Sequence, residues 1–156
     1  MQRTPIRADS VDGPTGRSNY PQPFASVVAG RTKRRLGDVF GLTNFGVNLT
    51  QLAPGSASAL VHQHSHQDEF LYVLEGHPTL LLGDDKMSLD PGDCVGFKAG
   101  DSDPHQLINE TQENVVLVEV GDRSVGDQVV YPHDDIQAAM TEQGTWAFTR
   151  KDGTAY

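Results

Sequence analysis

Apolar residues occur along most of this chain in short runs that are bounded by glycine, proline and aspartate. Few windows between residues 25 and 121 repeat with the period of a helix, and short bounded runs of this kind are typical of β-strands joined by tight turns. The pattern predicts strands at Phe24–Val28, Leu36–Leu42, Gly46–Leu52, Ala59–His64, Phe70–Leu74, Thr79–Leu82, Lys86–Leu89, Cys94–Phe97, Gln106–Asn109 and Val115–Val120.

Turn sequences separate several of these runs. Ala53-Pro54-Gly55 lies between two of them, and Gly83-Asp84-Asp85 fits a hairpin turn. Asp90-Pro91-Gly92-Asp93 has its proline and glycine where turn geometry prefers them. Many short strands with regular turns predict an all-β fold, either a sandwich or a small barrel.

The two ends of the chain differ from this middle part. Residues 1–24 are polar and rich in proline and glycine, which predicts an extended N-terminal arm without a core of its own. Residues 25–156 then form a single domain, with the barrel core at about 46–121. Near the C-terminus, Asp134–Gln143 predicts one short helix, capped by Asp134 or Asp135 and ended by Gly144.

Length, charge and cysteine content narrow the function classes. The 156 residues suit one domain, and a net charge of −9 disfavours nucleic acid or an anionic membrane as a partner. No apolar run is long enough to span a bilayer, and Met1–Pro5 contains no apolar signal core. Cys94 is the single cysteine, so we expect no internal disulfide, a buried position for this small side chain, and a cytoplasmic protein.

The segment around His62 and His64 carries the most chemical information. Residues two apart on a strand share a face, so both imidazoles can turn towards one ion. The polar residues Ser65–Asp68 predict a turn, after which Glu69 would begin an antiparallel strand across from His64. Two histidines and a carboxylate on neighbouring strands are typical of non-haem iron sites.

Two alternatives remain open from the residues alone. His66 lies in the predicted turn and is expected to be exposed or to support the site indirectly. Asp68 replaces Glu69 as the carboxylate ligand if the turn is one residue shorter.

These residues resemble the two motifs of the cupin superfamily. The first motif matches Gly55, six residues, His62-x-His64, four residues, Glu69, six residues and Gly76. The second begins at Gly92-Asp93, continues through Lys98-Ala99-Gly100 and ends at His105-x-x-x-Asn109. It departs from the usual pattern in having Lys98 where proline is common and His105 four residues after Gly100 instead of two. The wider run is similar to one subgroup of small single-domain bacterial cupins.

The resemblance implies a double-stranded β-helix, the jelly-roll barrel of cupins. It also implies one divalent metal ion per chain, held by His62, His64, Glu69 and His105, with iron, zinc, manganese and nickel as the alternatives. Small cupins of this kind are usually homodimers. The strand predicted at Phe70–Leu74, apolar on both faces, fits such an assembly, as does an N-terminal arm that adds to a partner's sheet.

Three function classes follow from a metal site in a barrel, where a small organic ligand would bind. Metal-dependent oxygenase chemistry is the leading hypothesis, because an open facial site can bind both O₂ and a chelating substrate. A metal-dependent sugar isomerase or lyase is the first alternative. Its sugar-phosphate form would need Arg or Lys at the barrel mouth, where the sequence indicates few. A binding protein without turnover is the third class.

Overall fold

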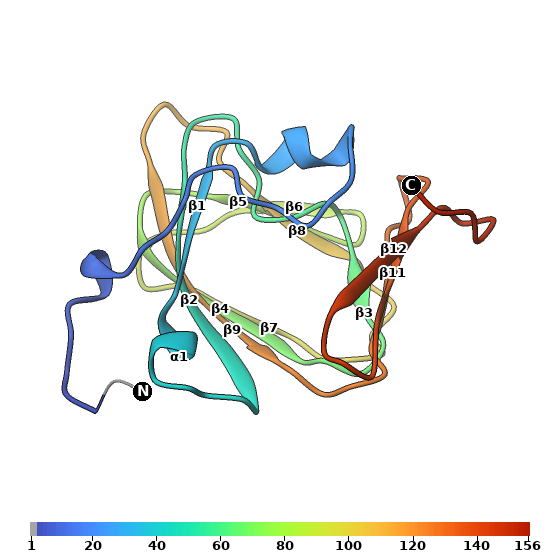
Figure 1. The fold of residues 1–156 in the computed structure, drawn as a ribbon. Coiled ribbons are helices and arrows are strands. Elements are labelled where there is room, and N and C mark those ends of the chain that lie inside the picture. Colours follow the sequence, from blue (N-terminus) through green and yellow to red (C-terminus); the bar gives the residue numbers. More distant parts are fainter. Residues whose placement is uncertain (1–2) are drawn as a thin grey trace.

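The computed structural model describes residues 3–156, which fold mainly into strands of three β-sheets (Figure 1). The first sheet has the order β1 (Arg31–Arg35), β2 (Phe45–Leu52), β9 (Val115–Asp122), β4 (Glu69–Glu75) and β7 (Cys94–Phe97). The second has the order β6 (Asp85–Ser88), β5 (Thr79–Leu82) and β8 (His105–Ile108). The third has the order β12 (Trp146–Thr149), β11 (Gln137–Met140), β10 (Gln128–Val130) and β3 (Gln63–His64). The short helices are η1 (Ala8–Ser10), η2 (Phe24–Val28) and α1 (Leu36–Val39). This is the predicted all-β jelly-roll architecture.

A pair of backbone hydrogen bonds joins the second and third sheets. The His62 N–H donates to the His105 carbonyl at 3.1 Å, and the His105 N–H donates back to the His62 carbonyl at 2.8 Å. Strand β3 follows His62 directly and β8 begins at His105. The bridge therefore turns the two sheets into one wall, which faces the five-stranded sheet in Figure 1.

One apolar cluster fills the space between the five-stranded and the three-stranded sheet. Its buried members are Leu52, Leu71, Val73, Val115 and Leu117 from the first sheet, with Leu80 and Leu107 from the second. Side chains alternate along a strand, so every second residue of β4 and β9 enters this core. Burying each aliphatic side chain contributes about 1.5–3 kcal/mol, which holds the two walls together.

A second cluster connects the third sheet to the N-terminal segment. Its buried members are Leu60, Val129, Tyr131, Ile136 and Ala138, against which Tyr20, Phe24, Val27, Trp146 and Phe148 pack. Because Tyr20 and Phe24 belong to the first part of the chain, this cluster fixes that segment beside the C-terminal strands.

Glycines define two of the turns. Gly83 begins the hairpin between β5 and β6, as predicted, where Leu82 pairs with Asp85. Gly76 has a φ angle of 78°, and a Cβ atom at that position would lie 2.6 Å from the carbonyl oxygen of Asn114. The turn after β4 therefore requires glycine both for its backbone conformation and for the close approach of the neighbouring loop.

The helix predicted at Asp134–Gln143 is wrong, because this segment contains strand β11. Gln137–Met140 pairs with β10 on one side and with β12 on the other. Ile136 and Ala138 are buried while their neighbours are exposed, which is the period of a strand. Pairing on both edges and burial in the second cluster override the local capping signals.

Three strand predictions near the N-terminal half also need correction. Phe24–Val28 is the 3₁₀ helix η2, and Leu36–Leu42 begins with the short helix α1. Ala59–His64 consists mostly of bends, with strand geometry only at Gln63–His64 and the bridge at His62. Strands β1, β10 and β12 were not predicted, and β1 escaped notice because its sequence, Arg31–Arg35, is polar throughout.

The N-terminal arm lies along its own chain. Thr15 forms a bridge with Thr32 of β1, and the Gly16 N–H donates to the Arg31 carbonyl at 2.7 Å. In this single chain the arm pairs with the edge strand of its own sheet, and its addition to a partner's sheet stays a prediction. No helix within residues 3–156 is long and apolar enough to cross a membrane.

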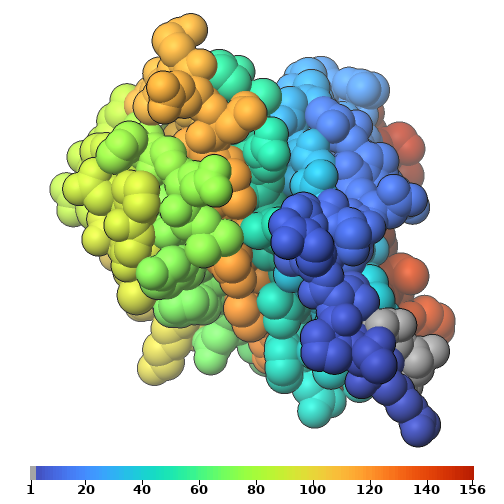
Figure 2. Space-filling model, turned by 90° about the vertical axis from the view of Figure 1, so that its left-hand side faces the viewer, coloured from blue at the N-terminus to red at the C-terminus, as the bar shows by residue number. Residues whose placement is uncertain are grey.

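The outer face of the five-stranded sheet is apolar and uncovered. Phe70, Tyr72 and Leu74 are 42%, 38% and 42% exposed, and Phe70 and Tyr72 lie opposite Val120 and Val118 of β9. Figure 2 looks onto this face, where β4, β9 and β2 run side by side as green, orange and teal bands. Aromatic side chains gathered on one sheet face are characteristic of a protein interface.

Cys94 belongs to the same side of the sheet. The expectation that it is buried is wrong, since its side chain is exposed. It pairs with Tyr72 across β4 and β7, and side chains of paired residues point to the same face. Its position at the sheet edge, beyond the core, explains the exposure.

We propose that two chains associate through this face, and we expect sedimentation to give twice the 16.9 kDa of one chain at micromolar concentration. Tyr72→Asp should give monomers, because a carboxylate in the middle of an apolar interface loses its hydration. Met87→Asp is the matched control, since Met87 is also 38% exposed but lies on β6 of another sheet. A wild-type protein that sediments only as a monomer contradicts the proposal.

Candidate metal centre

Three imidazoles converge on one carboxylate oxygen inside the barrel. The distances from Glu69 Oε2 to the Nε2 atoms of His62, His64 and His105 are 3.3, 3.5 and 3.0 Å. The ligand atoms of His62, Glu69 and His105 all lie within 4.8 Å of one another, which makes these three residues a candidate metal site. His64, the fourth predicted ligand, joins this group through its contact with the Glu69 carboxylate.

Backbone geometry explains how the histidines come together. His62 and His105 form the bridge between two sheets, so their side chains project side by side, with ring centroids 4.5 Å apart. His64 lies two residues further along the same segment and therefore shares the face of His62.

Glu69 comes from a different direction than the sequence predicts. It begins β4, as expected, but β4 pairs with β9 and β7, whereas His64 pairs with Val129 of β10. The expectation that Glu69 lies across from His64 on a paired strand is therefore wrong. The carboxylate reaches the imidazoles from the facing five-stranded sheet, and the cluster spans the interior of the barrel.

Hydrogen bonds fix which nitrogen of two imidazoles faces the cluster. His62 Nδ1 lies 2.8 Å from the Leu60 carbonyl, which can only accept, so this nitrogen carries the proton. His64 Nδ1 lies 2.5 Å from Oδ2 of Asp127, a fully buried carboxylate. Both Nε2 atoms are thereby left with a lone pair towards Glu69, the orientation that metal-bound histidines usually have.

Aromatic rings hold the imidazoles in place. Phe97 stacks on His105 with ring centroids 3.5 Å apart and an angle of 2° between the planes. Tyr131 stacks on His62, and the edge of Trp146 approaches His64. This packing restricts ring rotation, so the three nitrogens are organised before any ligand binds.

The charges of the cluster suit a cation. Burial acts to raise the pKa of Glu69, but the hydrogen bond with His105 and the other imidazoles around the carboxylate outweigh it and hold that pKa well below its usual value. Burial lowers the pKa of His105, which keeps this imidazole neutral. A carboxylate beside three imidazoles is a donor set that first-row divalent ions take, and the residues therefore fit a metal.

The two alternative ligands lie outside the cluster. His66 is exposed, and its Nδ1 lies 2.7 Å from the Ser65 hydroxyl. Asp68 is also exposed, and its carboxylate accepts a hydrogen bond from the Ala99 N–H at 2.7 Å. Glu69 is therefore the carboxylate that meets the histidines.

A cavity of about 1580 Å³ opens beside the cluster. The residues lining it include five basic ones: Arg17, Arg31, Lys33, Arg35 and Arg123. The expectation of few Arg or Lys residues at the barrel mouth is therefore wrong. Residues 31, 33 and 35 of β1 face inward because they pair with alternate residues of β2, a strand assignment that the polar sequence did not suggest.

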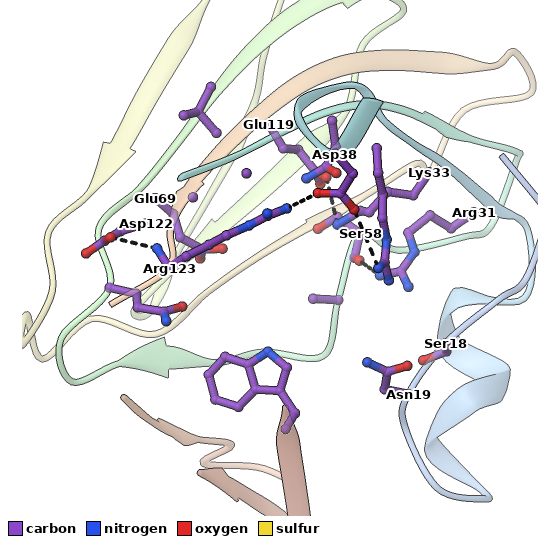
Figure 3. Close-up of a pocket in the computed structure, with 18 of the residues that line it drawn as sticks. Ser18, Asn19, Arg31, Lys33, Asp38, Ser58, Glu69, Glu119, Asp122 and Arg123 are labelled. Atoms are coloured by element: carbon purple, nitrogen blue, oxygen red, sulfur yellow. Dashed lines mark hydrogen bonds and ion pairs between the residues drawn. The ribbon is translucent and has the colours of Figure 1, made fainter. Parts of the chain in front are cut away.

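Acidic residues pair with most of these cations. Lys33 Nζ lies 2.8 Å from Glu119 Oε2, which also accepts a hydrogen bond from the Thr50 hydroxyl at 2.6 Å. Arg123 reaches Asp38 at 2.5 Å (Figure 3). Glu119 was missed from the sequence, although a charged residue inside the apolar run of β9 is a detectable signal of an inward-facing polar group.

The chain is similar to known proteins along most of its length. The Cupin domain family matches residues 48–121. A sugar phosphate isomerase from a cupin superfamily, from Silicibacter pomeroyi DSS-3, is 38% identical with a TM-score of 0.90, over 98% of this chain and 96% of that one. A provisionally named sugar phosphate isomerase from Acidithiobacillus ferrooxidans is 31% identical with a TM-score of 0.73, over 83% of each chain.

A more distant relative shares the fold alone. The polyketide cyclase RemF from Streptomyces resistomycificus is 19% identical with a TM-score of 0.62, over 78% of this chain and 80% of that one. No curated protein matches the chain. The motifs, the barrel and the similarity along nearly the whole length agree, and the chain belongs to the cupin superfamily.

Proposed function

We propose that this protein is a metal-dependent isomerase of a small phosphorylated sugar. One observation carries the proposal: a single cavity contains both the His–Glu cluster and a set of basic residues. A chelating group at one end of a ligand and an anionic group at the other match these two features. The names of the two relatives from Silicibacter and Acidithiobacillus support the same substrate class.

In this proposal His62, His64, Glu69 and His105 hold one divalent ion. Iron, zinc, manganese and nickel are all compatible with three imidazoles and a carboxylate. When bound, such an ion supplies Lewis-acid polarisation of a carbonyl or hydroxyl oxygen. The side chain of Glu69 is 32% exposed, whereas those of the histidines are 7–11% exposed, so the cluster is open towards the cavity from the side of the carboxylate.

Glu119 is our candidate for the proton transfer that isomerisation needs. It lies two residues from Gly121, the partner of Glu69 across β4 and β9, which places the two carboxylate-bearing positions about 7–8 Å apart on one sheet face. Its Oε2 atom accepts from Lys33 and Thr50, while Oε1 has no partner within residues 3–156. This oxygen can take a proton from one sugar carbon and return it to the next.

Oxygenase chemistry is the second candidate. The observation that favours it is the aromatic wall of Tyr131, Trp146 and Phe148, which lines the same cavity and could receive an aromatic substrate. The basic residues of the same cavity are less readily explained by such a substrate, so we rank it below the isomerase.

The metal assignment predicts that protein purified without chelators contains about one ion per chain. His64→Ala should lower the metal content sharply, because it removes an imidazole that faces Glu69 at 3.5 Å. His66→Ala is the matched control, two residues away and exposed, and should retain the metal. Elemental analysis of the three proteins is the measurement; equal loss from both variants, or full content in His64→Ala, would reject the assignment.

The hydrogen bond from His64 to Asp127 predicts a further effect on metal affinity. Asp127→Asn should weaken metal binding by about 10- to 100-fold, because the imidazole loses the charged acceptor that orients it. Asp84→Asn, at an exposed hairpin position, is the control. A competition titration against a chelator of known affinity measures the change, and unchanged affinity in Asp127→Asn contradicts the role of this carboxylate.

Activity itself can be tested with aldose phosphates offered to iron-, zinc-, manganese- and nickel-loaded protein, with ketose formation and oxygen uptake recorded together. We expect ketose phosphate without oxygen uptake, and loss of turnover after chelation. Glu119→Gln should lower kcat by about 100-fold or more at unchanged metal content. Glu142→Gln, which is exposed, should not.

The same assay separates the rival functions. Oxygen uptake with an aromatic substrate would favour the oxygenase. Binding of ligands without any product, for every metal, would leave a binding protein as the surviving interpretation.

A further inference from the structure

Two of the five cations that line the cavity, Arg17 and Arg31, have no carboxylate partner among residues 3–156, and of these two Arg17 is exposed. Lys33 is paired with Glu119, while Arg35 and Arg123 are both paired with Asp38. No carboxylate oxygen in the described part of the chain lies within 4.0 Å of the Arg31 guanidinium. Arg31 is half-buried, so its charge is also partly removed from water.

The hydrogen bonds of Arg31 are incomplete as well. One terminal nitrogen donates to the Ser58 carbonyl and the other to the Arg17 carbonyl at 3.2 Å. The Nε atom is buried, and its N–H has no partner among residues 3–156. A buried N–H without an acceptor is unfavourable by about 1–3 kcal/mol, and more when the group is charged. Two neutral carbonyls hold this cation in place without neutralising it.

The backbone of Arg31 is hydrogen-bonded or paired on both sides, so the position of this residue in the sheet is well defined. Its residue pairs with Leu52 of β2, and its carbonyl accepts from the Gly16 N–H of the N-terminal arm. Burial lowers the pKa of Arg31, the direction expected for a guanidinium that lacks a counter-ion. The fold thus holds a positive charge against the cavity at some cost in stability.

The metal cluster lies close enough to Arg31 for one small ligand to contact both. The segment that accepts from Arg31 at Ser58 continues to His62, four residues later, a span of at most about 13 Å along the chain and less because residues 58–61 bend. Tyr20 lies three residues after Arg17, whose carbonyl accepts from Arg31, and its ring packs edge-on against Tyr131 with centroids 5.9 Å apart. Tyr131 in turn stacks on His62, so two tyrosines lie between Arg31 and the cluster. Figure 3 shows Arg31 with Ser58, Ser18 and Asn19 on one side of the pocket and Glu69 on the other.

We propose that Arg31 binds the phosphate group of the substrate, with its unpartnered Nε–H and a terminal N–H forming a forked contact to two phosphate oxygens. The proposal rests on the proposed function and adds the residue that recognises the anionic end. A phosphate oxygen would accept the hydrogen bond that the Arg31 Nε–H does not make within the fold, and the phosphate would supply the missing negative charge. The sugar then extends from Arg31 along the tyrosines towards the His–Glu cluster.

Binding of three probes to the metal-loaded full-length protein tests this subsite by calorimetry. The probes are inorganic phosphate, an aldopentose 5-phosphate and the parent aldopentose. Arg31→Met should weaken binding of both phosphate-containing probes by about 10- to 100-fold, the range for a hydrogen bond to a charged group, and leave the parent sugar unaffected. Wild-type affinity in Arg31→Met would overturn the proposal.

Arg34→Met is a close control. Arg34 lies on the same strand and also has a buried Nε–H without a partner, but it does not line the cavity. Its substitution should leave all three affinities unchanged, and an equal loss there would overturn the assignment to Arg31.

A measurement on the unmodified protein keeps the test independent of how Arg31→Met folds. In ¹⁵N-labelled protein, the Nε–H resonance of Arg31 is identified by its absence in Arg31→Lys. It should shift and saturate during titration with inorganic phosphate, while that of Arg34 stays in place. A resonance that does not respond at saturating phosphate would overturn the subsite.

The outcomes separate the two proposals. Phosphate binding through Arg31 without isomerisation of any sugar phosphate would refute the proposed function and keep the subsite. Isomerisation that is insensitive to Arg31→Met in both KM and kcat would keep the function and refute the subsite.

Discussion

Two backbone hydrogen bonds between His62 and His105 connect the chemistry of this protein to its fold. They join the three-stranded and four-stranded sheets into one wall, and in the same contact they bring two imidazoles side by side. Glu69 belongs to the opposite wall, so the cluster forms only when the two walls are packed at their proper distance. The apolar cluster that includes Leu71, Leu107 and Leu117 sets that distance. Loosening of this core would therefore separate Glu69 from the histidines before the barrel itself unfolds.

The sequence predicted the fold wherever local and tertiary signals agree. Strands β5 and β7 have the predicted bounds, because apolar runs and turn residues delimit them on both sides. It failed where a segment's structure depends on distant partners. Gln137–Met140 has helical capping signals nearby but pairs with strands on both of its edges. Arg31–Arg35 is polar along its whole length, yet it is a barrel strand because its inward side chains line a cavity and not a core.

The candidate metal site was also predicted only in part from the sequence. The spacing of His62, His64 and Glu69 is local and was readable, and the second motif supplied His105. The direction from which Glu69 approaches was not readable, because strand pairing is a property of the whole sheet. Asp127 gives no sequence signal, since it lies far along the chain from the His64 ring it contacts. Its burial and its contact with an imidazole become visible only in three dimensions.

The net charge of −9 also says little about the field inside the cavity. Basic side chains of β1 alternate inward at residues 31, 33 and 35, so the register of one strand concentrates positive charge on the inner surface of an acidic protein. Glu119 and Asp38 then pair with the two other cations of β1 and with Arg123, and leave the half-buried Arg31 guanidinium without a carboxylate partner among residues 3–156. A cavity lined by evenly unpaired cations would attract any anion. Pairing three of the five cations confines the unneutralised charge to Arg31 and to Arg17, whose carbonyl Arg31 contacts. A local attraction at a fixed separation from the His–Glu cluster selects ligands by length as well as by charge.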